Sequence, residues 1–207
     1  MNKYKTQKNS GSASSSQDGF TIVEAMVAIF ILTVSVSSML GITASSAASA
    51  RYANNETTAN YLLQEAVDSI RNSRDTIAFQ MKATNEIAGT AWTAFLNRYG
   101  FSGNNKCFST YGCNLQIEDF DVSGINNSDV ISCPSSGCIP LKYDESAKLF
   151  YNYTSGSDSS FTRKVNMKIN PDNPDEVKVT AKIEWLNGDA TVPRTQTLTT
   201  YLLNWQK

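Results

Sequence analysis

The sequence of 207 residues contains no histidine. Catalytic sites of the Ser-His-Asp or Cys-His type and metal centres with histidine ligands are therefore excluded. It has no glycine-rich phosphate loop, and its acidic turns lack the alternating oxygen ligands and the glycine of a calcium loop. We expect no enzyme, no cofactor and no resident metal, with calcium at residues 172–176 as an open alternative. The acids concerned are Glu118, Asp119, Asp144, Glu145, Asp172, Asp175 and Glu176.

Charge is also nearly absent from residues 20–42, where Glu24 is the one ionisable side chain. A helix of this length measures about 35 Å, which exceeds the roughly 30 Å hydrocarbon core of a bilayer. Its hydroxyl side chains can bond to carbonyls of the preceding turn and so tolerate lipid. The segment is predicted to span a membrane. The hydroxyls belong to Thr21, Thr33, Ser35, Ser37 and Ser38.

Glu24 is costly at this depth unless it has a partner, so it marks a functional position. The alternative is that its side chain reaches the interface, although glutamate is short for this. The preceding residues 1–19 carry three lysines and one acid, Asp18. Positive charge on that side predicts a cytoplasmic leader, with the remainder of the chain outside. The lysines are Lys3, Lys5 and Lys8.

A secretory signal peptide with cleavage after residues 48–50 is a rival interpretation. The apolar run is longer than a usual signal core, and a polar spacer separates it from the lysines. An acid near its entry would weaken insertion without a benefit. These three features disfavour an ordinary signal peptide.

Residues 19–29, Gly-Phe-Thr-Ile-Val-Glu-Ala-Met-Val-Ala-Ile, resemble the prepilin signature of type IV pilins and of the pseudopilins of type II secretion. In that family a membrane peptidase cuts after the glycine, and the new terminal aromatic is N-methylated. The resemblance implies cleavage between Gly19 and Phe20, N-methylation of Phe20, and assembly through the Phe20 amine and Glu24. It covers about residues 19–45.

Two features depart from the commonest family pattern. Asp18 stands where a basic or polar residue is more frequent, and the helix-breaking proline of many major pilins is absent. Whether the helix melts near Gly41 during assembly is therefore open. The residues at 24–29 and 62–66 are more similar to those of minor pilins or pseudopilins than to those of abundant shaft pilins.

The resemblance implies a structural subunit, expected to be a minor one, of a type IV pilus-like filament. The expected partners are other pilin subunits, the prepilin peptidase and methylase, and a membrane assembly platform. The protein would reside in the inner membrane and then in an extracellular filament. Alternatives are a pseudopilin, or a membrane-anchored or tip adhesin or DNA-binding module whose head recognises a surface, a polysaccharide or DNA.

Apolar residues at helical spacing predict that the helix continues over residues 50–73 with one buried face. A second helix is expected at residues 85–98, with Gly100 suited to a C-cap and Trp92 and Phe95 in the core. The stripe on the first helix comprises Ala59, Leu62, Leu63, Ala66, Val67 and Ile70.

Period-two alternation in residues 161–169 and 177–185 predicts strands, and a third strand is predicted at residues 195–205. We expect an antiparallel sheet within residues 105–206, packed on the helix face that carries Leu62 and Ile70. The fold class is α+β and pilin-like. The expected parts are a leader at 1–19, an assembly helix at 20–45 and an extracytoplasmic head at 46–207.

Four lysines are expected on the outer face of this sheet: Lys164, Lys168, Lys178 and Lys182. Such a face normally serves solubility and edge protection, with DNA binding as an alternative. The net charge is −1, and removal of the leader's three lysines and one aspartate makes it −3. The mature chain is thus not expected to attract nucleic acid generally.

The four cysteines form two local sets, and their even number in an exported chain favours disulfides. Three connectivities are possible. We expect the local pairing, with each bridge worth about 2 kcal/mol because the loops are short. A zinc site of four thiolates is the alternative, although the spacing is unlike that of zinc ribbons. The residues are Cys107, Cys113, Cys133 and Cys138.

Overall fold

A computed structural model describes residues 19–84, 89–103, 105–117, 129–147, 150–186 and 191–205. The chain divides into two units, Met1–Ser49 and Ala50–Lys207. The predicted leader before Gly19 and the acids Glu118 and Asp119 lie outside the described residues.

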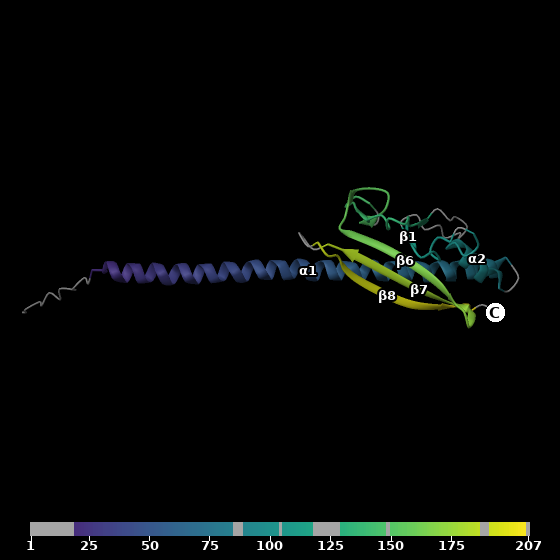
Figure 1. The fold of residues 1–207 in the computed structure, drawn as a ribbon, viewed down its shortest axis with the longest axis horizontal. Helices are drawn as coiled ribbons and strands as arrows, with labels where there is room; N and C mark the ends of the chain where they lie inside the picture. Colours follow the sequence, from purple (N-terminus) through teal and green to yellow (C-terminus); the bar gives the residue numbers. More distant parts are fainter. Residues whose placement is uncertain are drawn as a thin grey trace, which may run out of the picture. The chain divides into compact units, whose positions relative to one another are not determined.

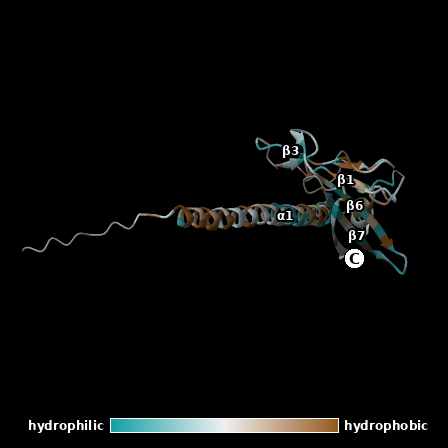
Figure 2. Cartoon of the chain, turned by 60° about the vertical axis from the view of Figure 1, so that its left-hand side comes forward, coloured by the Kyte–Doolittle hydropathy of each residue, from teal (hydrophilic) through white to brown (hydrophobic). Residues whose placement is uncertain are grey.

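Within the described residues, one helix is long and apolar enough to cross a membrane: α1 (Ile22–Ala83). In the first unit its large apolar side chains are all exposed, from Phe20 to Ile42. Figure 2 shows hydrophobic residues along this part of α1. A helix that is apolar all round needs lipid or other helices around it. The first unit therefore has the surface expected of a membrane helix.

In the second unit, α1 buries one stripe of side chains against the sheet, as predicted. The helix continues to Ala83, beyond the expected end at residue 73. The buried stripe does not stop at Ile70, because Ser73 is itself buried and Ile77 continues the stripe one turn later. The buried residues of α1 are Ala59, Leu62, Leu63, Ala66, Val67, Ile70, Ser73, Ile77 and Ala78.

The second helix, α2 (Thr90–Arg98), begins after its N-cap Gly89 and not at residue 85 as expected, because Gly89 has a left-handed φ of 93°. Residues 85–88 lie outside the described residues. The helix ends in a Schellman motif. The Gly100 amide donates to the Asn97 carbonyl at 2.9 Å, and the Phe101 amide donates to the Leu96 carbonyl at 3.1 Å. Gly100 has φ 92°, and a Cβ there would lie 2.4 Å from the Lys106 amide nitrogen. Only glycine fits this C-cap, as predicted. Trp92 and Phe95 lie in the core, also as predicted.

Five antiparallel strands form the main sheet, in the order β2-β1-β6-β7-β8. The long strands are β6 (Phe161–Asn170), β7 (Asn173–Trp185) and β8 (Arg194–Leu203), a meander as predicted. Figure 1 shows them side by side across the C-terminal part of α1, and their inward side chains share one core with it. The α+β fold expected from the sequence is confirmed.

Shorter strands occupy the segment between α2 and β6. β1 (Cys113–Leu115) pairs with β2 (Val130–Ser132) and with β6. A separate sheet has the order β4-β3-β5, formed by β3 (Lys142–Tyr143), β4 (Tyr151–Asn152) and β5 (Ser157–Asp158). Strands of two residues cannot display a period of two, so the sequence pattern could not locate them.

Arg163 holds α1, β1 and β6 together from inside the core. Its guanidinium donates to the Glu65 carboxylate at 2.6 Å, to the Leu62 carbonyl at 3.1 Å and to the Leu115 carbonyl at 3.0 Å. Burial alone would lower the pKa of Arg163, but coulombic attraction to Tyr153 and Glu65 raises it. The charge is therefore kept in the interior by its partners.

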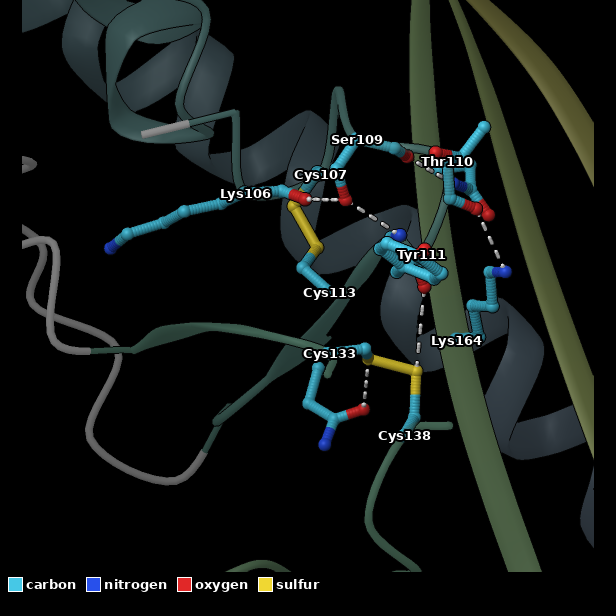
Figure 3. Close-up of a disulfide and its surroundings, with 12 residues drawn as sticks. Lys106, Cys107, Ser109, Thr110, Tyr111, Cys113, Cys133, Cys138 and Lys164 are labelled. Atoms are coloured by element: carbon cyan, nitrogen blue, oxygen red, sulfur yellow. Dashed lines mark hydrogen bonds between the residues drawn. A yellow bond between two sulfur atoms is a disulfide. The ribbon is translucent and has the colours of Figure 1, made fainter. Parts of the chain in front are cut away.

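The disulfides follow the local pairing favoured by the sequence. Cys107 is bonded to Cys113, and Cys133 is bonded to Cys138. The first bridge lies in the core, while Cys138 is partly exposed beside Tyr111 (Figure 3). All four sulfurs are consumed, so the thiolate zinc site considered as an alternative has no ligands here.

Candidate functional site

The start of α1 has an N-cap residue, Thr21. Its hydroxyl accepts a hydrogen bond from the Glu24 amide at 3.2 Å, and its carbonyl accepts one from the Ala25 amide at 3.1 Å. A threonine at this position satisfies an amide that the first helical turn would otherwise leave unbonded. The spacing Thr-x-x-Glu is the sequence signal of this cap, which was not among the predicted features.

Glu24 occupies the third helical position, in the first turn. In a full capping box its carboxylate would bond back to the Thr21 amide. Among the described residues no group pairs with this carboxylate, and only its backbone amide takes part in the cap. The helix N-terminus attracts the negative charge, but the acid remains available for a further partner.

Gly19 and Phe20 precede the helix in non-helical backbone. A Cβ built at Gly19 meets no atom within 4 Å, and its φ lies outside the left-handed region. The Phe20 side chain is 74% exposed. Nothing in the described fold requires a glycine here, and the bond between these two residues is accessible.

Thr21 caps the helix and does not bond back to a carbonyl as predicted. The other four hydroxyls predicted to do so, and two further ones, bond to carbonyls of the preceding turn. Each donates to a carbonyl three or four residues earlier, at distances of 2.7 to 2.9 Å. Such bonding removes the cost of exposing a hydroxyl to lipid. The donors are Thr33, Ser35, Ser37, Ser38, Thr43 and Ser45.

The head carries a second candidate surface, the lysine face, defined by Lys164, Lys168, Lys178 and Lys182. Lys164 lies directly opposite Lys182, and Lys168 directly opposite Lys178, on β6 and β7. The two pairs are four residues apart along each strand, a separation of about 13 Å. The prediction that these lysines share one face of the sheet is confirmed.

No group of three or more histidine, cysteine, aspartate or glutamate side chains in the described chain could hold a metal ion. The turn proposed for calcium is occupied by local hydrogen bonds. Asn170 donates to Glu176 at 3.2 Å, and Asn204 donates to Asp175 at 2.9 Å. These acids serve the turn between β6 and β7 and its contact with the end of β8.

Comparison with known proteins identifies the N-terminal segment. Residues 14–40 match the family described as the prokaryotic N-terminal methylation motif. No curated protein and no solved structure matches the chain. The motif implies processing by prepilin peptidase and assembly with other pilin subunits, and together with an apolar helix it fits membrane anchoring before assembly into a surface filament. The chain carries the prepilin motif of type IV pilins and pseudopilins, which points to a structural subunit.

Proposed function

We propose that this protein is a structural subunit, of the minor class, of a type IV pilus-like filament. Prepilin peptidase would cut between Gly19 and Phe20, and the methylase would modify the Phe20 amine. The accessible bond and the open space at Gly19 support this, because the fold itself gives no reason for glycine at that position. The glycine then serves the peptidase.

The observation that carries the proposal is the unpaired Glu24 carboxylate at the entry of an apolar helix, where no described residue partners it. Such a group is costly in lipid, and a partner must bring opposite charge. Cleavage creates one, the ammonium group of Phe20. Two unit charges about 4 Å apart attract by about 4 kcal/mol at an effective dielectric of 20.

This charge pair sets the register of assembly. Glu24 of an incoming subunit would bind the Phe20 ammonium of a subunit already in the filament, while the apolar helices pack together and leave the bilayer. The half-formed capping box supports this role, since Thr21 stabilises the first turn without using the carboxylate. The membrane helix then supplies contact area, and the charges supply register.

Replacement of Glu24 tests the proposal. Glu24→Gln keeps the size and polarity of the side chain but removes its charge, and Asp68→Asn removes one exposed charge from the same helix as a control. We expect the Glu24→Gln variant to be inserted and cleaved but absent from sheared filaments, and the control to be incorporated. Normal incorporation of the Glu24→Gln variant would refute charge pairing. A deletion strain that keeps its filaments but loses protein secretion would indicate a pseudopilin instead.

A further inference from the structure

A pocket lies on the outer face of the sheet beside the loop closed by the Cys133–Cys138 disulfide. Its volume is about 200 Å³, far above the roughly 10–15 Å³ that one water needs, and it can admit a ligand the size of one sugar ring. We refer to it as the loop pocket. Its lining residues are Tyr111, Pro134, Ser135, Gly137, Cys138, Thr162, Lys164, Lys182 and Glu184.

Two elements hold the wall of the loop pocket in place. The Cys133 amide donates to the Gly112 carbonyl at 3.0 Å, which ties the disulfide loop to the end of the segment that carries Tyr111. The Cys138 sulfur contacts the Tyr111 carbonyl at 3.9 Å. Figure 3 shows Tyr111 next to this disulfide, with Lys164 nearby. The wall is thus cross-linked before any ligand arrives, which lowers the entropic cost of binding.

The pocket's polar groups are mixed in charge. Lys164 donates to the Thr110 carbonyl at 3.2 Å, which fixes one of its three N–H groups and leaves the ammonium at the rim. Lys182 forms an ion pair with Glu184, and the side chains of both are 40% exposed. Hydroxyls of Ser135 and Thr162 complete the polar lining. The site offers two cations, one anionic acceptor and two hydroxyls.

We propose that the loop pocket binds a carboxylated sugar unit of an acidic polysaccharide. The sugar carboxylate would bind Lys164 and Lys182, and a sugar hydroxyl would donate to Glu184. The C–H face of the ring would pack on Tyr111, a residue that is 51% exposed. Such a sugar has an apolar face, hydroxyl groups and a carboxylate. The pocket offers an aromatic ring, a carboxylate acceptor and a pair of ammonium groups that match these three parts in turn.

Nucleic acid fits this chemistry less well. Proteins often bind phosphate through the bidentate guanidinium of arginine, and among the described residues that line the pocket there is no arginine. Duplex DNA carries one charge per about 1.7 Å of its axis, so it depends on an extended cationic surface. The mature chain has a net charge of −3, which opposes general attraction of a dense polyanion. A single sugar carboxylate bound in the pocket needs only the two ammonium groups of Lys164 and Lys182.

The test is calorimetric titration of the full chain in detergent micelles with tetragalacturonate. The lysine face supplies a matched control, because Lys168 and Lys178 are opposed in the same way but lie outside the pocket. The double variant Lys164→Gln and Lys182→Gln should weaken binding at least tenfold, and the corresponding variant of Lys168 and Lys178 by less than about threefold.

A third variant, Tyr111→Leu, keeps the backbone contact with Cys138 and should weaken binding about fivefold through loss of the aromatic face. It also provides a readout should the lysine variant fail to fold. Absence of tetragalacturonate binding would overturn the proposal, as would equal losses from the two lysine pairs. Tighter binding of a DNA oligonucleotide of equal charge would overturn it too, in favour of nucleic acid. Because the assay uses no filament, its outcome is independent of the proposed role of Glu24.

Discussion

Arg163 on β6 donates to Glu65 on α1 at 2.6 Å, and the two residues are 98 positions apart in the chain. The arginine side chain is 2% exposed and the glutamate side chain 26%. The pair therefore joins the sheet to the helix at a point where one partner is buried and the other is still partly hydrated. Because the two charges differ in burial, removing one partner should change the free energy of unfolding by a different amount from removing the other.

Glu65→Leu should destabilise the head by about 3 kcal/mol, because it leaves a buried guanidinium without its counter-charge. Arg163→Met also removes the hydrogen bonds to the Leu62 and Leu115 carbonyls, but it leaves no buried charge because the remaining carboxylate can be hydrated, so it should cost less. Adding Arg163→Met to Glu65→Leu should therefore restore stability, as measured by denaturant unfolding of the full chain in micelles. Asp68→Asn, which removes an exposed pair, should change stability by at most about 0.5 kcal/mol. Additive losses in the double variant would contradict this account of the pair.

Tyr99 should make the head sensitive to alkali. Burial raises its pKa from 10.0 to about 12 in the folded chain. Above pH 10 the unfolded chain loses this proton before the folded chain does. The contribution of Tyr99 to the free energy of unfolding is therefore fully present below pH 10, and it is lost as the pH rises through 12, by up to about 3 kcal/mol. Tyr99→Phe should reduce this slope. An unchanged slope would show that other groups cause the alkaline loss, such as Tyr153, whose pKa burial also raises.

The two disulfides should differ in their contribution to stability. Each closes a short loop, worth about 2 kcal/mol by chain entropy. Cys107 and Cys113 are fully buried, so serine at both positions would add two buried hydroxyls. We expect the Cys107→Ser and Cys113→Ser protein to unfold at lower denaturant concentration than the Cys133→Ser and Cys138→Ser protein. Alanine at the buried pair should be milder than serine, and the reverse order would contradict the burial argument.

Thr21 should control the first turn of α1. Thr21→Ala removes the acceptor for the Glu24 amide and should cost about 1 kcal/mol locally. Hydrogen exchange at that amide, followed by NMR in micelles, should accelerate about fivefold, as expected for a loss of this size. Thr21→Ser retains the hydroxyl and should exchange like the unsubstituted chain. Equal rates for the alanine and serine variants would show that the hydroxyl does not cap the helix.

Much of the head could be predicted from the sequence, because β6 and β7 alternate buried and partly exposed residues over much of their length. Arg163 could not. Its spacing from Phe161 and Val165 puts it on the buried face, but a charged residue contradicts the apolar pattern, and its partner lies on a distant helix. The end of α1 was placed too early for a related reason, since the buried polar Ser73 hides the continuing stripe.

The N-terminal site was predictable in its residues but not in its local geometry. The positions of Gly19, Phe20 and Glu24 follow from a spacing in the sequence. The role of Thr21 follows from a hydrogen bond, which the sequence only permits. The loop pocket could not be predicted at all, because it requires the Cys133–Cys138 loop to lie beside β6 and β7.

The central claim is tested most directly by intact-mass analysis of the protein recovered from sheared surface filaments. The account predicts a chain that begins at Phe20 and is heavier by one methyl group, with both disulfides intact. A chain that begins at Arg51 would contradict it and indicate an ordinary signal peptide, whose cleavage would have to occur within the helical residues of α1. Absence of the protein from filaments that are otherwise present would contradict it equally.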